Sequence, residues 1–456
     1  MFESITDPHL LDTIRYLKVL EKTFNSNTIC SAKWLQATTL LYNGTTHSCH
    51  HNPRHKIDYY DVQKNHTLIF NTPQKIKERK MMKSSNRPSG CEYCWKFEDQ
   101  GDLSDRYYKS ASYLWSRDNI DRLETNTPLP TYFEIAFDNT CNFKCMYCTP
   151  ESSSKWMEEI KRHGPYETSD RFNCLDQLIK DDKVPIANKD YNPYIEAFWK
   201  WWVQLRESLT VLRLTGGEPL LSKHVWKIID ELIDKPNQNM ILGINTNLGV
   251  EDNLIDRFIE KIKVLEKTIK RLEIYTSCEA YGEQAEYIRF GLNYNSFLSN
   301  CDKILANTKD VHLIIMMANN VLSIFSLKEF IKDIQKLQIK YPNRIILDMA
   351  VLTYPAFLAI NILEESITRP ILEDVICHLE NTGTARDVES AKRLLNSAYR
   401  PVVHKQVLLR DFAKFFIEYD KRRKSDFNSL FPQLNYLLKE YQKNKNNRPI
   451  IRAKIR

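Results

Sequence analysis

The chain has 456 residues, 42% of them hydrophobic and 11% aromatic, which is ample material for two cores and for up to three domains. Its formal net charge of +7 is modest for that length. The longest apolar run, residues 345–363, is interrupted by Asp348 and Pro355, which excludes a transmembrane span. Eleven cysteines behind a polar amino terminus predict a cytoplasmic protein with reduced thiols and no disulfides.

The first 128 residues contain four cysteines whose spacing predicts one closed site. Thirteen residues separate Cys30 from Gly44, four more precede Cys49, and Cys91 and Cys94 follow as a C-x2-C pair. The glycine suits a hairpin bend that brings the halves together. Four thiolates satisfy either an iron-sulfur cluster or the zinc of a zinc ribbon.

Histidines flank the second of these cysteines. We interpret them as a solvated polar turn, with a ligand or proton donor as the alternative: His47, His50 and His51.

A predicted apolar strand over residues 132–137 leads into a compact cysteine loop. The loop has the spacing C-x3-C-x2-C, formed by Cys141, Cys145 and Cys148. Three thiolates hold a 4Fe-4S cluster and leave its fourth iron open, whereas a structural cluster is closed by a fourth thiolate. Half a zinc site or three unrelated cysteines would give the same spacing, so context must decide.

The context is a second strand-end motif. A predicted strand over residues 209–214 is followed by Thr-Gly-Gly-Glu-Pro, which contains Gly216, Gly217 and Glu218. Glycines let the backbone approach a ligand closely, and the carboxylate offers a charge-assisted hydrogen bond to an ammonium group.

Together with Tyr147 directly before the third cysteine, these motifs resemble the radical S-adenosylmethionine (radical SAM) superfamily. The resemblance covers residues 28–435. It implies that the open iron of the cluster chelates the amino and carboxylate groups of S-adenosylmethionine. It also implies reductive cleavage of that cofactor to a 5'-deoxyadenosyl radical, with an electron from a reductant such as flavodoxin or ferredoxin.

Apolar strands alternate with amphipathic helices after the cysteine loop. Further strands are predicted over residues 240–244, 272–275, 311–317 and 345–351, and helices over residues 223–233, 253–267, 294–306 and 327–340. The fold class is therefore α/β. Six strand-helix units predict a partial (β/α)6 TIM-like barrel, whose site lies at the carboxyl ends of the strands.

Polar residues that follow these strands match the order of cofactor contacts in the resembled family. The resemblance implies that Ser277 and Arg289 hold the carboxylate of the cofactor, and that Tyr147 and Asn247 hold its adenosine end. Asn320 is the last member of the set. Each of them is also an ordinary turn or cap residue.

The spacing from Cys30 through Gly44 to Cys49 resembles the opening of the SPASM and twitch modules, which hold auxiliary 4Fe-4S clusters. In those families the module follows the barrel, whereas here it precedes it. One auxiliary cluster is the expectation, with zinc as the alternative.

Three domains are predicted: a cysteine-rich module over residues 1–128, a barrel over 129–360 with an insertion at 164–208, and a helical extension over 361–456 with a basic tail. The insertion ends in an aromatic helical stripe, which predicts a core-facing helix. In the extension, Asp420-Lys-Arg-Arg followed by Phe431-Pro432 resembles the end of twitch-containing proteins. The remaining cysteines are interpreted as buried free thiols: Cys174, Cys278, Cys301 and Cys377.

The predicted function is hydrogen abstraction from a substrate by a radical SAM enzyme. Relatives with SPASM or twitch modules most often modify peptides or proteins, so a peptide or protein side chain is the first choice. A small metabolite and a nucleic acid or nucleotide are the alternatives. A zinc-stabilised interaction protein is the non-enzymatic alternative.

Overall fold

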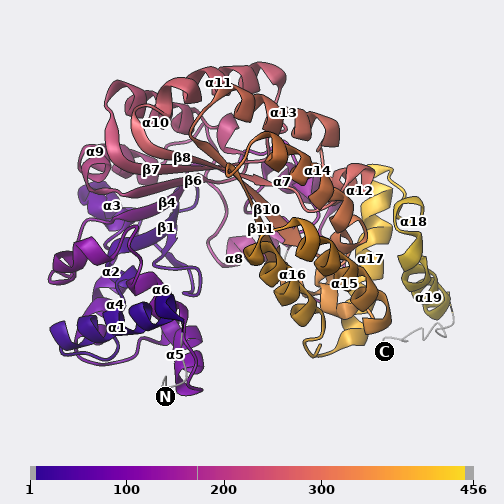
Figure 1. Ribbon diagram of the computed structural model, residues 1–456, viewed down its shortest axis with the longest axis horizontal. Helices are drawn as coiled ribbons and strands as arrows, with labels where there is room; N and C mark the ends of the chain where they lie inside the picture. Colours follow the sequence, from indigo (N-terminus) through magenta and orange to yellow (C-terminus); the bar gives the residue numbers. More distant parts are fainter. Residues whose placement is uncertain (1–6, 172, 447–456) are drawn as a thin grey trace, which may run out of the picture.

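The computed structural model describes residues 7–171 and 173–446, and a nine-stranded sheet organises that part of the chain (Figure 1). Consecutive parallel strands neighbour one another in chain order, with one or more helices between them. These strands are β4 (Tyr132–Ala136), β6 (Val211–Thr215), β7 (Asn237–Thr246), β8 (Ile269–Ser277), β10 (Val311–Asn319) and β11 (Ile345–Val351). The predicted α/β class with a large parallel sheet is confirmed.

Amphipathic helices connect the later strands and bury one apolar face on the sheet, as the three- and four-residue spacing of their apolar residues predicts. They are α10 (Lys223–Asp234), α11 (Asp252–Leu265), α12 (Gly282–Ile288), α13 (Tyr294–Asn307) and α14 (Leu327–Lys340). In Figure 1, α10, α11 and α13 run along the outer side of an arch. Short 3-10 turns accompany them: η4 (Pro219–Leu221), η5 (Ser323–Ser326), η6 (Ala356–Leu358) and η7 (Ile360–Ile362).

The amino-terminal segment extends the sheet instead of standing beside it. Strand β1 (Gln36–Leu40) pairs in parallel with β4, and β2 (Thr45–His47) and β3 (His55–Lys56) continue antiparallel to the sheet edge. Val211 and Ile241, from the strands of the predicted barrel, belong to the same apolar core as Trp34 and Trp115. The predicted boundary between residues 128 and 129 stays a prediction, and the sheet continues across it.

Short helices surround this edge of the sheet. They are α1 (Pro8–Thr23), α2 (Ala32–Leu35), α3 (Asp61–Lys64), η1 (His66–Ile69), α4 (Pro73–Lys83), η2 (Ser89–Cys91), α5 (Glu92–Asp99), α6 (Asp105–Ser110) and η3 (Arg117–Leu123).

The insertion between β4 and β6 contributes helices α7 (Ser154–His163), α8 (Leu175–Lys180) and α9 (Pro193–Ser208). Helix α9 begins at a proline, and the Asn192 side chain caps its first amides. Its predicted stripe is buried, with Tyr194 and Trp201 each 1% exposed. The stripe is therefore core, and truncating Trp201 to Ala would cost about 3–5 kcal/mol.

The carboxyl-terminal extension is helical as predicted, with α15 (Glu365–Thr382), α16 (Ala385–Ala398), α17 (Lys405–Arg423), α18 (Phe427–Leu430), η8 (Pro432–Leu434) and α19 (Asn435–Asn446). The predicted basic tail begins inside α19, and residues 447–456 lie outside the described residues. Helix α17 packs Phe415, Phe416 and Tyr419 into the main core.

The eleven cysteines of the chain are free, and the scattered ones differ in exposure. Cys174, Cys278 and Cys301 are buried as predicted. The prediction for Cys377 is wrong, because this residue of α15 is exposed. In the described part of the chain, no helix combines the length and apolarity needed to cross a membrane.

Candidate functional site

The cysteine loop lies at the carboxyl end of β4 and is fixed by a small second sheet. Its strand β5 (Lys144–Cys145) pairs antiparallel with β9 (Arg289–Phe290), so that Cys145 lies opposite Arg289. The backbone N–H of Phe143 lies 3.4 Å from the Sγ of Cys141. This pairing brings together residues that are 144 positions apart in the sequence.

One pocket gathers most of the predicted cofactor residues at the carboxyl ends of β6, β7 and β8. Its lining includes all three cysteines of the loop together with Tyr147, Gly216, Gly217, Asn247, Ser277 and Arg289. Parallel strands place their carboxyl ends at one edge of a sheet, which is why these distant motifs meet.

The two glycines are needed for close packing of the loop after β6 on the cysteine loop. A Cβ atom on Gly217 would lie 2.3 Å from the carbonyl oxygen of Thr140. Gly216 has a φ of +134°, and a Cβ there would lie 2.7 Å from the carbonyl oxygen of Asp138. Only glycine satisfies both constraints. The Gly-Gly pair therefore allows the loop after β6 to pack against the cysteine loop, and in that position it also lines the pocket.

Glu218 is not among the residues that line this pocket. It is 1% exposed, and its carboxylate accepts hydrogen bonds from the Thr246 hydroxyl (2.7 Å), the Asn247 amide (2.7 Å) and the Leu220 amide (3.0 Å). Burial raises its pKa to about 7. Glu218 therefore ties the loop after β6 to the loop after β7, and its direct contact with an ammonium group stays a prediction.

Arg289 is held by a carboxylate that sequence reasoning missed. Its Nε and Nη2 atoms each lie 2.9 Å from Glu279 Oε2, and the Tyr147 hydroxyl donates to Glu279 Oε1 at 3.0 Å. Nη1 of Arg289 lies 3.6 Å from the Sγ of Cys145. Burial opposes the charged guanidinium, and Glu279 more than offsets this, so the pKa of Arg289 is raised. Glu279 follows Ser277 by two residues, just past the carboxyl end of β8. An acidic residue at this strand end is the sequence signal that could have identified it.

The loop thiols favour their neutral form in the absence of a metal. Burial raises the pKa of Cys141 to about 12 and also raises the pKa values of Cys145 and Cys148. A metal ligand must be a thiolate, so a bound cation or cluster has to compensate for this burial.

Two residues that were predicted to contact the cofactor form hydrogen bonds with other residues of the protein. Asn247 lines the pocket, and its side chain also donates to Asn142 and accepts from the Gly249 amide. Asn320 is fully buried, and its side-chain oxygen accepts from the amides of Leu322 and Ser323. The structure therefore does not bring Asn320 to the pocket.

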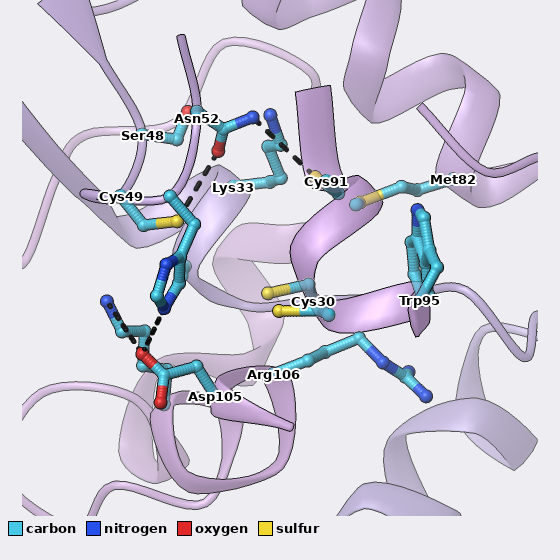
Figure 2. Close-up of a pocket in the computed structure, with 14 residues that line it drawn as sticks. Cys30, Lys33, Ser48, Cys49, Asn52, Met82, Cys91, Trp95, Asp105 and Arg106 are labelled. Atoms are coloured by element: carbon cyan, nitrogen blue, oxygen red, sulfur yellow. Dashed lines mark hydrogen bonds and ion pairs between the residues drawn. The ribbon is translucent and has the colours of Figure 1, made fainter. Parts of the chain in front are cut away.

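The amino-terminal cysteines converge on a second pocket, beside the first residues of the sheet (Figure 2). Cys30, Cys49, Cys91 and Cys94 all line it. Asn52 links two of them, because Cys49 Sγ lies 3.4 Å from its Oδ1 and Cys91 Sγ lies 3.7 Å from its Nδ2. Burial raises the pKa of Cys91 to about 11 and that of Cys94 to about 12.

Two buried cations accompany these sulfurs. Lys33 is 2% exposed and pairs with Glu78, and Arg106 is 4% exposed and pairs with Glu98 at 2.8 Å. Figure 2 shows both side chains around the cysteine pocket. Because each cation is held by a carboxylate, the pocket offers positive charge next to thiolates at a fixed position.

The flanking histidines differ from a uniform solvated turn. His50 is exposed, with 64% of its side chain accessible. His51 is mostly buried, lies 2.9 Å from the Asp105 carboxylate and stacks on Tyr93. A ring nitrogen of His47 lies 2.5 Å from the carbonyl oxygen of Cys49. The solvated-turn interpretation therefore holds only for His50.

Comparison with known proteins found no matching family model. The chain is similar over part of its length to GTP 3',8-cyclase of Campylobacter lari, at 28% identity over 119 residues, which is 26% of this chain and 28% of that protein. It is also similar to GTP 3',8-cyclase of Sulfurimonas denitrificans, at 26% identity over 142 residues, or 30% and 35% of the two chains. A third relative is molybdenum cofactor biosynthesis protein 1 of Dictyostelium discoideum, at 25% identity over 127 residues, or 28% and 15%. The chain thus spans about a third or less of the curated relatives it matches.

Proposed function

We propose that the chain is a radical SAM enzyme that cleaves S-adenosylmethionine reductively and abstracts hydrogen from a nucleotide-type substrate. The observation that carries the proposal is the single pocket that unites the C-x3-C-x2-C loop, the Gly-Gly pair and Arg289. A loop of unrelated cysteines has no reason to be packed against those other motifs.

We assign the 4Fe-4S cluster to Cys141, Cys145 and Cys148, and S-adenosylmethionine to the same pocket. When bound, this pair supplies a 5'-deoxyadenosyl radical, with an electron from a reductant such as flavodoxin or ferredoxin. The Arg289 guanidinium is fixed by Glu279 and lies 3.6 Å from the Sγ of Cys145, and it would hold the carboxylate of the cofactor. Ser277 and Asn247 offer polar atoms, and the Gly-Gly backbone provides close approach.

The spacing from Cys30 through Gly44 to Cys49, with the C-x2-C pair of Cys91 and Cys94, supports a cluster rather than zinc at the amino-terminal site, because it resembles the opening of the SPASM and twitch modules. We therefore propose one auxiliary 4Fe-4S cluster on the four amino-terminal cysteines, in a twitch- or SPASM-like arrangement that precedes a partial (β/α)6 barrel.

A nucleotide-type substrate is favoured over the peptide that sequence analysis placed first. Two of the relatives are GTP 3',8-cyclases, which are named for a reaction of GTP, and this similarity supports a nucleotide over a peptide. A reducing, cytoplasmic location agrees with eleven free cysteines.

Anaerobic reconstitution tests the proposal. The wild-type protein, with dithionite and S-adenosylmethionine, should release 5'-deoxyadenosine, and Cys145→Ala should not. Cys377→Ala is the matched control, because Cys377 is exposed on α15, away from both pockets. Release by the Cys145→Ala variant at the rate of the control would refute the assignment.

A further inference from the structure

The guanidinium of Arg289 contacts the cysteine loop through one nitrogen and a carboxylate through the other two. Nη1 lies 3.6 Å from the Sγ of Cys145, whereas Nε and Nη2 each lie 2.9 Å from Glu279 Oε2. The antiparallel pairing of β5 with β9 places Cys145 directly opposite Arg289, so the backbone supports the same contact. The sulfur therefore has a positive charge beside it at a defined position, and the balancing carboxylate binds a different edge of the guanidinium.

Both charges of this pair are removed from solvent. The Arg289 side chain is 6% exposed, and the Glu279 side chain is fully buried. The second oxygen of Glu279 accepts from the Tyr147 hydroxyl at 3.0 Å, so three donors in all stabilise its negative charge. Charges in such surroundings act on their neighbours much more strongly than charges in water do, because the effective dielectric constant is low.

These fixed charges act on the place where an electron is expected to arrive. The proposed function assigns a 4Fe-4S cluster to the loop, and the three sulfurs that line its pocket are the donor set that such a group requires. Reduction adds one negative charge beside Cys145. A cation near the sulfurs stabilises that added charge and a carboxylate opposes it, so the surrounding charges and hydrogen bonds set the reduction potential.

The guanidinium has enough donors to act on the sulfur and on a ligand of the pocket together. It carries five N–H groups in a fixed fork. Glu279 takes one from Nε and one from Nη2, and Cys145 takes one from Nη1. One N–H therefore remains on each of Nη1 and Nη2. An effect of Arg289 on the loop does not compete with its proposed contact to the carboxylate of the cofactor.

We propose that Arg289 and Glu279 set the reduction potential of the cysteine loop site, with Arg289 raising it and Glu279 limiting the rise. The inference rests on the proposed function and deepens it, because it gives these two residues a part in electron entry. Arg289 is the nearer charge, since its own nitrogen contacts the sulfur. The net effect of the pair is therefore a higher potential. Glu279 is a positioning residue, which holds the guanidinium against Cys145.

Potentiometric titration with dithionite, followed by electron paramagnetic resonance without S-adenosylmethionine, tests this assignment. The signal that changes when an excess of S-adenosylmethionine is added afterwards identifies the loop site. Glu279→Gln removes a negative charge at constant shape and should raise the midpoint potential, whereas Arg289→Gln should lower it. Each shift should be about tenfold in the equilibrium constant of reduction, or about 59 mV for one electron.

Three further variants separate the effect of charge from that of packing. Tyr147→Phe removes a donor to Glu279 without changing a charge, and should shift the equilibrium constant by less than about threefold. Arg289→Lys keeps the charge and should shift the midpoint less than Arg289→Gln does. Glu260→Gln is the matched control and should have no effect, because its carboxylate is 73% exposed on α11 and pairs with Lys263.

The double variant Glu279→Gln with Arg289→Gln covers the case in which a single variant does not fold, because it leaves neither buried charge without its partner. Its midpoint should lie below that of the wild type, since the nearer charge is the one that counts more. A double-variant midpoint at or above the wild-type value, or single-variant shifts of the same sign, would overturn the assignment. Absence of a cluster from the wild-type loop would reject the proposed function, whereas release of 5'-deoxyadenosine with unshifted midpoints would reject this inference alone.

Discussion

The two cysteine sites are built in opposite ways. The three cysteines of the loop lie within eight consecutive residues, Cys141 to Cys148, so local spacing sets their arrangement. The four amino-terminal cysteines come from the turn before α2, the turn after β2, η2 and α5. Only the packing of these elements against one edge of the sheet brings them together. A contiguous site is readable from sequence, whereas a dispersed site depends on the fold.

Both sites nevertheless use the same electrostatic device. A buried cation held by a carboxylate lies beside the sulfurs: Arg289 with Glu279 at the loop, and Arg106 with Glu98 at the amino-terminal pocket. Pairing fixes each cation and limits the cost of burying it. The sites differ in what they face, since the loop pocket opens at the strand ends and the amino-terminal pocket lies at the sheet edge.

The largest expected effect comes from removing the contiguous site entirely. Changing Cys141, Cys145 and Cys148 together to Ala should abolish release of 5'-deoxyadenosine. If the dispersed site holds a cluster and is independent, about four irons per chain should remain. Metal analysis of the purified variant measures this. Zinc with negligible iron would establish a zinc ribbon instead, and loss of all metal would show that the two sites do not assemble independently.

The second largest effect is expected from a change at the four amino-terminal cysteines, which form the dispersed site. Cys94→Ala removes one of four thiolates, so substrate turnover should be lost while some cleavage of S-adenosylmethionine continues at the loop. Product and 5'-deoxyadenosine are quantified in the same reaction, with Cys174→Ala as a control for a cysteine outside both pockets. Full product from a folded Cys94→Ala protein would mean that the dispersed site is only structural.

A smaller effect is expected at the cation of the loop site. Arg289→Ala removes the proposed partner of the cofactor carboxylate and should weaken binding of S-adenosylmethionine by about 10- to 150-fold. Glu279→Gln keeps the guanidinium in place and should weaken it less. Equilibrium binding to reconstituted protein decides between them, after iron content has been matched. Equal losses in both variants would indicate that Glu279 itself is the essential group.

Sequence reasoning succeeded where the signal is local. The helix predicted over residues 327–340 is α14 with the same bounds, and the strand predicted over 311–317 extends by only two residues. The loop cysteines and the Gly-Gly pair were identified from short motifs that support each other, each directly after a predicted strand. Glu218 was found too, although its three internal donors became visible only in the folded chain.

The missed features depend on contacts between distant segments. Strand β1, Gln-Ala-Thr-Thr-Leu, has weak apolar character. Its place in the sheet comes from its parallel pairing with β4, which lies about 95 residues later in the chain. Glu279 acquires its importance from its contacts with Arg289 and Tyr147. Asn320 matches the order of cofactor contacts in the resembled family, but its side chain accepts hydrogen bonds from the following turn. No periodicity in the sequence contains such information.

The smallest expected effect tests whether the carboxyl-terminal helix supports only the contiguous site. Nη2 of Arg423 on α17 lies 3.0 Å from Glu159, which also pairs with Lys144 of the cysteine loop at 2.9 Å. Arg423→Gln leaves Glu159 with Lys144, Arg422 and the Tyr166 hydroxyl, so the variant should lose about 1–3 kcal/mol of stability. Lys421→Gln is the control, because that side chain is 78% exposed on the same helix.

The measurement is the urea midpoint together with the rate of iron release to a chelator. Arg423→Gln should accelerate loss of the iron bound by the cysteine loop, since Lys144 lies between Cys141 and Cys145 and Glu159 anchors it. Iron at the amino-terminal pocket should be released at the wild-type rate, because none of its four cysteines contacts α17 through a described hydrogen bond or ion pair. Equal acceleration at both sites would mean that α17 stabilises the whole sheet, and the contrast between a locally supported and a fold-dependent site would fail.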